Sequence, residues 1–198
     1  MNLLIIVDPQ YDFIEGGKLP VEGGTKALDN VANLIKKGDI GQVIITKDWH
    51  PADHISFDHF GGDFPEHCVQ DSFGAKVYQP IIDAIKEANV EVLDTITKGM
   101  DREEFSAIEP FPVKRRNSFI FDLTEGSTLS LGDDNVILCG LAGDICVLNT
   151  LDALNYKDAP YNLFIYLEGT ASLDDGSKLD EYMVKNDIKV FRNYPPEE

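Results

Sequence analysis

Residues 135–155 read NVILCGLAGDICVLNTLDALN and join an apolar run to a glycine-containing turn and a helical pattern. The run from Asn135 to Leu138 predicts a buried strand. A helix beginning close to Gly143 is expected to follow, with one face formed by Val147, Thr150, Leu151 and Leu154. A strand, a tight turn and a helix form the repeating unit of a parallel sheet that is covered by helices.

The same order recurs through the rest of the chain. Further strands are predicted at Leu3 to Val7, Gln42 to Thr46, Val90 to Leu93, Leu163 to Tyr166 and Lys189 to Phe191. Helical spacing is found in three sets, which are Leu28, Val31, Ala32 and Ile35; Ile81, Ala84, Ile85 and Ala88; and Leu179, Tyr182 and Met183. The pattern predicts an α/β fold with three layers, in which a mainly parallel six-stranded sheet has helices on both faces.

The segment from Lys98 to Asp134 is poorly periodic, and its period is interrupted by Pro110, Pro112, Gly126 and Gly132. We expect it to form loops. The 198 residues suit a single domain, 1–198, with a sizeable buried core.

The charge balance excludes one class of partner. The chain has 35 acidic and 17 basic residues and a formal net charge of -18, so its average surface repels nucleic acid.

The apolar start ends at Asp8, far short of a membrane span, and has no basic flank or cleavage region, so we expect no membrane partner. An odd count of 3 cysteines agrees with a reducing compartment, and we expect a cytoplasmic protein.

Polar residues that directly follow strands are the candidates for chemistry, because ligands of open α/β sheets bind beyond the carboxyl ends of the strands. One cleft is expected to collect Asp8, Asp48, His50, Lys98 and Cys146.

Cys146 would lie in the first turn of its helix, where amides and the helix dipole favour thiolate over thiol. A cysteine there can equally be a small buried apolar side chain. Asp8 alone can be read as a turn cap, and Lys98 alone as a solvated lysine. Their shared position at the strand ends favours a nucleophile with a neighbouring base.

All four histidines lie between His50 and His67, and Asp48 stands two residues before the first of them. Two imidazoles and one carboxylate suit zinc, iron or manganese and leave coordination positions open. A surface role is favoured for His59, whereas direct ligation and an indirect role are left open for His54. Packing roles are expected for Cys68 and Cys139.

Five ordered motifs together resemble the nicotinamidase branch of the isochorismatase-like cysteine hydrolases, over nearly the whole chain. They are Val7-Asp8-Pro9-Gln10-Tyr11-Asp12-Phe13, Asp48-Trp49-His50-Pro51 with His54-Ile55-Ser56-Phe57, Phe64-Pro65-Glu66-His67-Cys68, Lys98-Gly99, and Gly140-Leu141-Ala142-Gly143-Asp144-Ile145-Cys146-Val147. The family has an isochorismatase-like, Rossmann-like fold.

The resemblance implies roles for particular residues. A catalytic triad would consist of Asp8, Lys98 and Cys146. One divalent metal ion, zinc before iron or manganese, would be held by Asp48, His50 and His67, with His54 as a further candidate. The ring of the substrate would be lined by Phe13, Leu19, Phe64 and Phe105. A cis peptide between Leu141 and Ala142 would aim the amides of Ala142 and Cys146 at one oxyanion.

The activity implied by the resemblance is conversion of nicotinamide to nicotinate and ammonia through a thioester, in NAD salvage. Three departures from the family pattern bear on pocket size and substrate preference, namely Gly143, Ile145 and Phe64. Alternatives are hydrolysis of isochorismate, another amide or an N-carbamoyl compound, a metallohydrolase with an inert Cys146, and a non-catalytic metal or ligand binder. Assembly into a homo-oligomer is left open.

Overall fold

The computed structural model describes residues 1–37, 40–104, 113–115, 118–122 and 128–192. A six-stranded sheet lies at its centre, with strand order β3-β2-β1-β7-β8-β9 and every neighbouring pair parallel. Its strands are β1 (Asn2–Val7), β2 (Gln42–Asp48), β3 (Glu91–Lys98), β7 (Asn135–Gly140), β8 (Asn162–Thr170) and β9 (Lys189–Val190).

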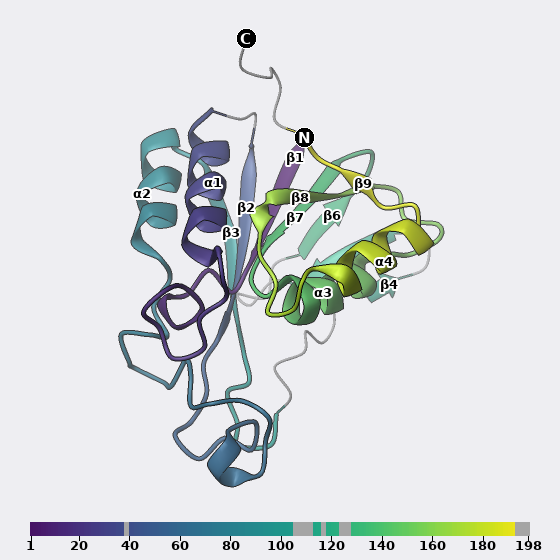
Figure 1. The fold of residues 1–198 in the computed structure, drawn as a ribbon. Coiled ribbons are helices and arrows are strands. Elements are labelled where there is room, and N and C mark those ends of the chain that lie inside the picture. The colour runs from purple at the N-terminus through teal and green to yellow at the C-terminus, as the bar shows by residue number, and fades with distance from the viewer. Residues whose placement is uncertain (38–39, 105–112, 116–117, 123–127, 193–198) are drawn as a thin grey trace.

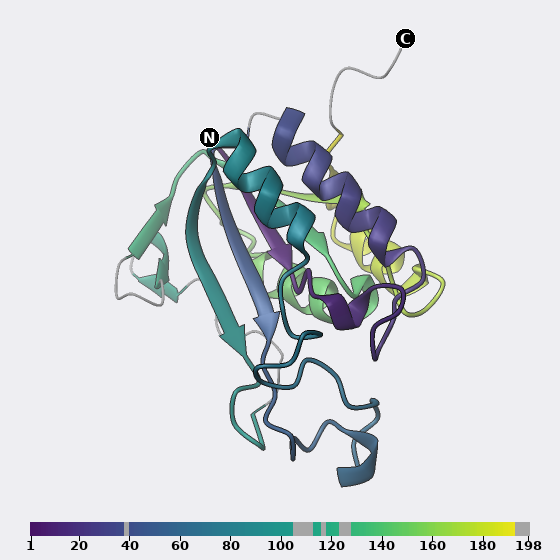
Figure 2. The same cartoon turned by 90° about the vertical axis from the view of Figure 1, so that its left-hand side faces the viewer.

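Helices cover both faces of this sheet, which confirms the predicted three layers (Figures 1 and 2). α1 (Gly24–Lys37) and α2 (Gln79–Ala88) lie on one face, and α3 (Leu148–Leu154) and α4 (Ser177–Lys185) lie on the other. Short helical turns are η1 (Tyr11–Phe13), η2 (Asp58–Phe60) and the π-helical η3 (Gly143–Val147).

The central strand β1 is apolar from Leu3 to Val7 because both of its faces are covered. Leu3, Ile5 and Val7 pack in the cluster that contains residues of α3 and α4. Leu4 and Ile6 pack in the cluster that contains residues of α1 and α2. Successive side chains of a strand point to opposite faces, so a strand covered on both faces needs apolar residues at consecutive positions.

The strand order reverses between β1 and β7, which are neighbours in the sheet although far apart in the sequence. Val7 at the end of β1 pairs with Gly140 at the end of β7. The loops after these two strands leave in opposite directions, and such a switch point is where doubly wound sheets bind ligands. Asp8 directly follows β1 at this point, and the turn that leads to Cys146 directly follows β7.

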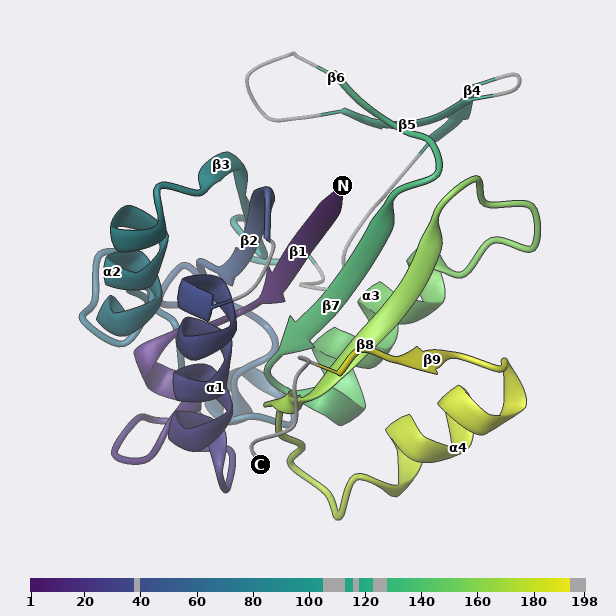
Figure 3. The same cartoon turned by 90° about the horizontal axis from the view of Figure 1, so that it is seen from above.

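The expectation of loops from Lys98 to Asp134 is wrong in part. β4 (Val113–Arg115), β5 (Ser118–Asp122) and β6 (Thr128–Leu131) form an antiparallel sheet that stands beside the main one (Figure 3). These strands are 3, 5 and 4 residues long, too short to show a period in the sequence.

Two strands of the main sheet also continue beyond their apolar runs. Lys47 pairs with Thr97 and Asp48 pairs with Lys98, so backbone pairing extends β2 and β3 into polar residues. Within the described ranges, no helix is both long and apolar enough to cross a membrane.

Candidate active site

Lys98 lies at the centre of a buried polar cluster beyond the strand ends. Its ammonium group donates a hydrogen bond of 2.6 Å to Asp8 Oδ2 and another hydrogen bond to Asp48 Oδ1, and lies 3.8 Å from Cys146 Sγ. The register places Asp48 directly opposite Lys98, and Asp8 follows the next strand, β1. Four predicted site residues from four strand ends therefore meet, as the parallel topology requires.

The two carboxylates beside Lys98 differ in proton affinity. Burial raises the pKa of Asp8, although the Lys98 charge opposes it. Burial acts in the same sense on Asp48, but the Lys98 charge and the contact with His50 outweigh it and hold the pKa of Asp48 below its usual range. Burial would lower the pKa of Lys98, yet both carboxylates raise it well above its ordinary value. The cluster thus holds a charged lysine, an ionised Asp48, and Asp8 as the more basic carboxylate.

Cys146 reaches the cluster through the turn between β7 and α3. It lies in η3, and its thiol faces a cavity. Burial raises the pKa of this thiol well above its ordinary value, with Lys98 opposing and Asp8 and Asp48 adding to the rise. The expectation that the helix terminus favours thiolate is therefore wrong, because desolvation and two carboxylates outweigh it. The raised pKa favours the thiol form of Cys146.

The turn before Cys146 contains the cis peptide between Leu141 and Ala142. The carbonyl of Ala142 accepts hydrogen bonds from the amides of Ile145 (3.2 Å) and Val147 (3.0 Å), and the amide of Gly143 donates to Ala171 O at 2.7 Å. No hydrogen bond uses the Ala142 amide within the part of the chain that the structure describes. That amide is available to a ligand in the cavity.

Asp48, His50 and His67 bring together three candidate metal-ligand atoms, all within 4.8 Å of one another. Asp48 Oδ2 lies 3.5 Å from His50 Nε2 and 4.0 Å from His67 Nε2. Burial lowers the pKa of His67, which favours the neutral, ligating form. The predicted set is therefore assembled and buried.

The far ring nitrogens of the two histidines fix their orientation. His50 Nδ1 lies 2.9 Å from Gly99 O and His67 Nδ1 lies 2.7 Å from Pro65 O. A carbonyl accepts a hydrogen bond from the protonated Nδ1, and this tautomer leaves the Nε2 lone pair free. His50 Nε2 is buried without a hydrogen-bond partner among the described residues. An orphaned imidazole nitrogen beside a carboxylate fits a divalent cation.

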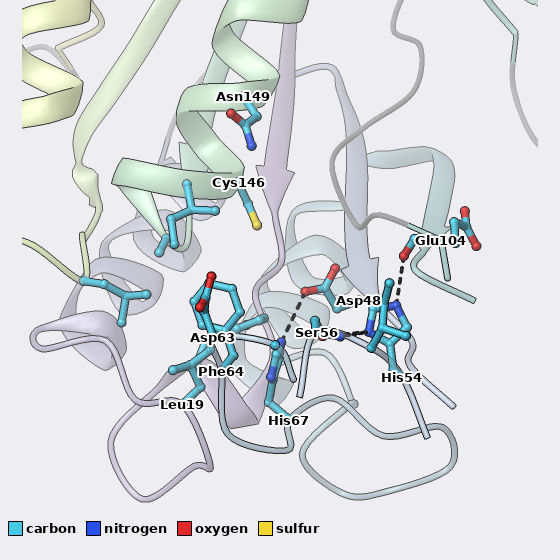
Figure 4. A pocket seen from close by; sticks show the side chains of 16 residues that line it. Leu19, Asp48, His54, Ser56, Asp63, Phe64, His67, Glu104, Cys146 and Asn149 are labelled. Atoms are coloured by element: carbon cyan, nitrogen blue, oxygen red, sulfur yellow. Dashed lines mark hydrogen bonds and ion pairs between the residues drawn. The ribbon is translucent and has the colours of Figure 1, made fainter. Parts of the chain in front are cut away.

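A cavity of about 320 Å³ opens between the thiol and this metal set (Figure 4). Phe13, Leu19 and Phe64 line it, as the resemblance implied, whereas Phe105 lies outside the described residues. Its size is at the lower end of the range for small-molecule sites. The lining also includes residues that the sequence did not single out, Asp63, Glu104, Asn149 and Leu173.

Comparison with known proteins agrees with this geometry. The model of the isochorismatase domain matches residues 2–181. The chain belongs to the isochorismatase family. The fold and the resemblance read from the five motifs are thereby confirmed at the level of the family.

Several relatives of this isochorismatase-family protein are nicotinamidases. The Saccharomyces cerevisiae nicotinamidase is 26% identical over 219 residues, covering 96% of each chain. The Escherichia coli nicotinamidase is 33% identical over 178 residues, covering 76% of this chain and 75% of the relative.

Two solved structures are similar over most of the chain. An L. infantum protein in complex with nicotinate has a TM-score of 0.73 and 25% identity, covering 97% of this chain and 92% of that one. The pyrazinamidase of Pyrococcus horikoshii in complex with zinc has a TM-score of 0.67 and 25% identity, covering 97% and 99%.

The remaining histidines of this isochorismatase-family protein have other partners. His54 Nδ1 lies 2.6 Å from Ser56 Oγ and His54 Nε2 lies 2.9 Å from Glu104 O, so both ring nitrogens are engaged. Its ring stacks on His50 with centroids 4.1 Å apart. This arrangement favours the indirect role for His54. His59 is exposed and pairs with Asp58.

The other two cysteines are buried. Cys139 lies in β7 with its sulfur 3.7 Å from Ile5 O, and burial raises its pKa. Cys68 is buried, and its amide donates a 2.7 Å hydrogen bond to Asp12 Oδ2. Both positions agree with packing roles.

Two supporting residues were missed by sequence reasoning. Thr46 donates a 2.7 Å hydrogen bond to Asp8 Oδ1, and nothing in a strand sequence distinguishes it from other buried threonines. Gln10 donates to Asp48 O at 2.7 Å and accepts from Asp48 N at 2.8 Å. Gln10 lies in the motif that contains Asp8, and its position two residues after Asp8 is the signal that could have identified it.

Proposed function

We propose that this protein is a metal-dependent cysteine amidohydrolase that converts nicotinamide to nicotinate and ammonia and serves NAD salvage. One observation carries the proposal: a buried lysine joins the more basic carboxylate, Asp8, to a carboxylate of the candidate metal set, with the Cys146 thiol beside both. The nicotinamidases among the relatives and the nicotinate-bound L. infantum protein support the choice of substrate.

The first half of the reaction forms a thioester. Asp8 takes the thiol proton of Cys146, and the sulfur bonds to the carboxamide carbon while the carbonyl electrons move to oxygen. The amides of Ala142 and Cys146 stabilise that oxyanion. As the C–N bond breaks, Asp8 returns the proton to nitrogen and ammonia leaves. A raised pKa makes Asp8 a stronger base for the first transfer, and a thiol is the form that needs this base.

The second half regenerates the enzyme. Asp8 takes a proton from water, the hydroxide oxygen bonds to the thioester carbon, and the carbon–sulfur bond breaks to give nicotinic acid, which loses its carboxyl proton to solvent and leaves as nicotinate. The thiolate recovers the proton from Asp8. Throughout, Lys98 keeps its charge and balances the change on Asp8, since two carboxylates raise its pKa.

The candidate metal set would hold a divalent ion through Asp48, His50 and His67. We favour zinc, because two imidazoles and a carboxylate suit it and a zinc-bound relative has the same fold. When bound, such an ion supplies a coordination position that an aromatic ring nitrogen can occupy. Phe13, Leu19 and Phe64 would enclose the ring.

The test is release of ammonia from nicotinamide by the purified, zinc-supplemented protein. We expect Cys146→Ala to lose at least about 10³-fold in kcat while retaining the wild-type zinc content, because nucleophile and metal ligands are separate groups. Cys139→Ala, which removes a buried thiol from β7, the strand that precedes the turn, is the matched control and should retain activity. Substantial turnover by Cys146→Ala would overturn the thiol mechanism, and an inactive wild type would overturn the proposed function.

A further inference from the structure

Three carboxylates line the cavity, and two of them have partners. Asp48 accepts a hydrogen bond from Lys98. Glu104 Oε2 accepts hydrogen bonds from the amides of Met100 (2.7 Å) and Asp101 (3.1 Å), so the backbone of the preceding turn stabilises its negative charge. For Asp63, no hydrogen bond or ion pair occurs within the residues that the structure describes, and its side chain is exposed to the cavity.

The backbone on both sides of Asp63 is held in place. The Gly62 amide donates to Phe57 O at 2.9 Å, and the Phe64 amide donates to Ser56 O at 3.1 Å. A Cβ at Gly62 would lie 2.1 Å from the Ser56 backbone, so only glycine permits this close approach. Figure 4 shows the Asp63 carboxylate directed into the cavity on the side of Cys146.

Positive side chains do not offset this charge at the cavity wall. Among the described lining residues there is no lysine or arginine, and Lys98, which lies behind the wall, is engaged by Asp8 and Asp48. An exposed aspartate is negatively charged at neutral pH. A ligand carboxylate near Cys146 is therefore repelled by the charge of Asp63, whereas a neutral carboxamide in the same place is not.

We propose that Asp63 is a specificity-determining residue that disfavours anionic ligands in the cavity, and so selects neutral carboxamides and promotes departure of the carboxylate product. This inference rests on the proposed function, in which the substrate is neutral and the product is an anion. Asp63 would thereby weaken inhibition by the carboxylate product and disfavour amides that also carry a carboxylate.

The experiment compares the inhibition constant Ki of nicotinate with the KM of nicotinamide, on zinc-loaded wild type and Asp63→Asn. One charge removed at a partly solvated site should strengthen nicotinate binding on the order of 3- to 10-fold at low salt, with a much smaller change in KM. Since screening weakens this repulsion, 0.5 M salt should bring the two Ki values together. The bound ion is the same in both proteins, so the difference isolates Asp63.

Asp58→Asn is the matched control, because Asp58 is an exposed acid of the same loop that does not line the cavity. It should leave the ratio of Ki to KM unchanged. Asp63→Glu, which keeps the charge, should retain weak nicotinate binding. Equal Ki values for wild type and Asp63→Asn in an active enzyme, or the same shift in Asp58→Asn, would overturn the inference and leave the proposed function standing. An inactive wild type would instead remove the proposed function on which the inference rests.

Discussion

Lys98 donates hydrogen bonds to Asp8 and to Asp48, yet the pKa values of these two carboxyl groups shift in opposite directions. Both are buried, which favours the neutral acid. Asp48 has a second stabilising neighbour, His50, and this contact helps to keep its pKa low. Lys98 thus contacts two carboxylates of different character. Asp8 has a raised pKa, which suits proton transfer, and Asp48 has a lowered pKa, which suits binding of a cation.

Replacing Asp8 with asparagine tests the first of these roles. The amide can neither accept the Cys146 proton nor return it to ammonia, so kcat should fall on the order of 10²- to 10⁴-fold. Burial raises the pKa of Asp8 above its ordinary value of 3.8, so wild-type kcat/KM should fall with decreasing pH at a pH above 3.8. In Asp8→Asn the residual activity should lack that acid limb. A wild-type kcat in Asp8→Asn would show that Asp8 has only a structural role.

Thr46 makes a finer prediction, because its hydroxyl donates to Asp8 Oδ1 and this hydrogen bond lowers the pKa of Asp8. Thr46→Val keeps the shape of the side chain and removes the donor, so the pKa of Asp8 should rise further. The acid limb of kcat/KM should therefore move to higher pH, and Thr46→Ser should restore it. If the valine variant is less active at every pH without any shift of the limb, Thr46 contributes packing alone.

At the scale of elements, the register of β2 with β3 decides which polar side chains meet. Asp48 pairs with Lys98 at the last position of both strands. A shift of one residue would turn Lys98 to the opposite face of the sheet, since side chains alternate along a strand. The apolar core of the sheet therefore determines the position of a charged pair that contributes little to the core itself.

The start of α1 allows a prediction on stability. Glu15 accepts hydrogen bonds from the Thr25 hydroxyl and from the amides of Thr25 and Gly23, both at 3.0 Å. The Thr25 hydroxyl, first among these, lowers the pKa of Glu15 to about 2. Because this exposed carboxylate caps the helix, Glu15→Gln should lower the free energy of unfolding at pH 7 by about 0.5–1 kcal/mol.

The pH dependence of this effect has a definite sign. A carboxylate with a depressed pKa stabilises the folded state fully above its unfolded pKa, near 4.5, and loses that contribution as pH falls toward about 2. Urea unfolding should show the gap between wild type and Glu15→Gln closing over this window. Glu22→Gln, which changes an exposed acid of the same segment, is the control and should show no such gap.

On the scale of the whole molecule, the cavity has a candidate metal set at one end and a thiol at the other, supplied by segments that are far apart in the sequence and meet only in the folded protein. Nicotinamide carries a ring nitrogen away from its carboxamide, and benzamide has the same outline without it. A site built around one polar partner rejects the analogue that lacks it. The wild type should prefer nicotinamide by on the order of 10²-fold or more in kcat/KM.

His50→Ala should reduce this preference. It should also lower zinc affinity, measured by titration with a chelating dye, because it removes an imidazole with an orphaned nitrogen. We expect nicotinamide hydrolysis to weaken far more than the residual benzamide reaction. A loss of the same factor for both amides would mean that the ion has a general or structural role and does not orient the ring.

The main sheet and its helices could be predicted from the sequence because burial of strands and helices requires apolar residues in regular local patterns. Strands such as β1 are apolar at consecutive positions, and helices such as α1 are apolar at every third or fourth residue. The antiparallel strands β4 to β6 could not be found in this way. Their pairing is local and short, and such strands depend on backbone hydrogen bonds that leave little trace in residue type.

The side chains that meet in the candidate active site could also be predicted from the sequence. Asp8, Asp48, Lys98 and Cys146 each follow or end a strand, and parallel strands present their carboxyl ends at one edge. The shifts in pKa, the engaged nitrogens of His54, the support from Thr46 and the exposure of Asp63 to the cavity were decided only by the tertiary structure. Residue type records what a side chain can do, whereas desolvation and distance to other charges decide what it does, and both arise only when distant segments are packed together.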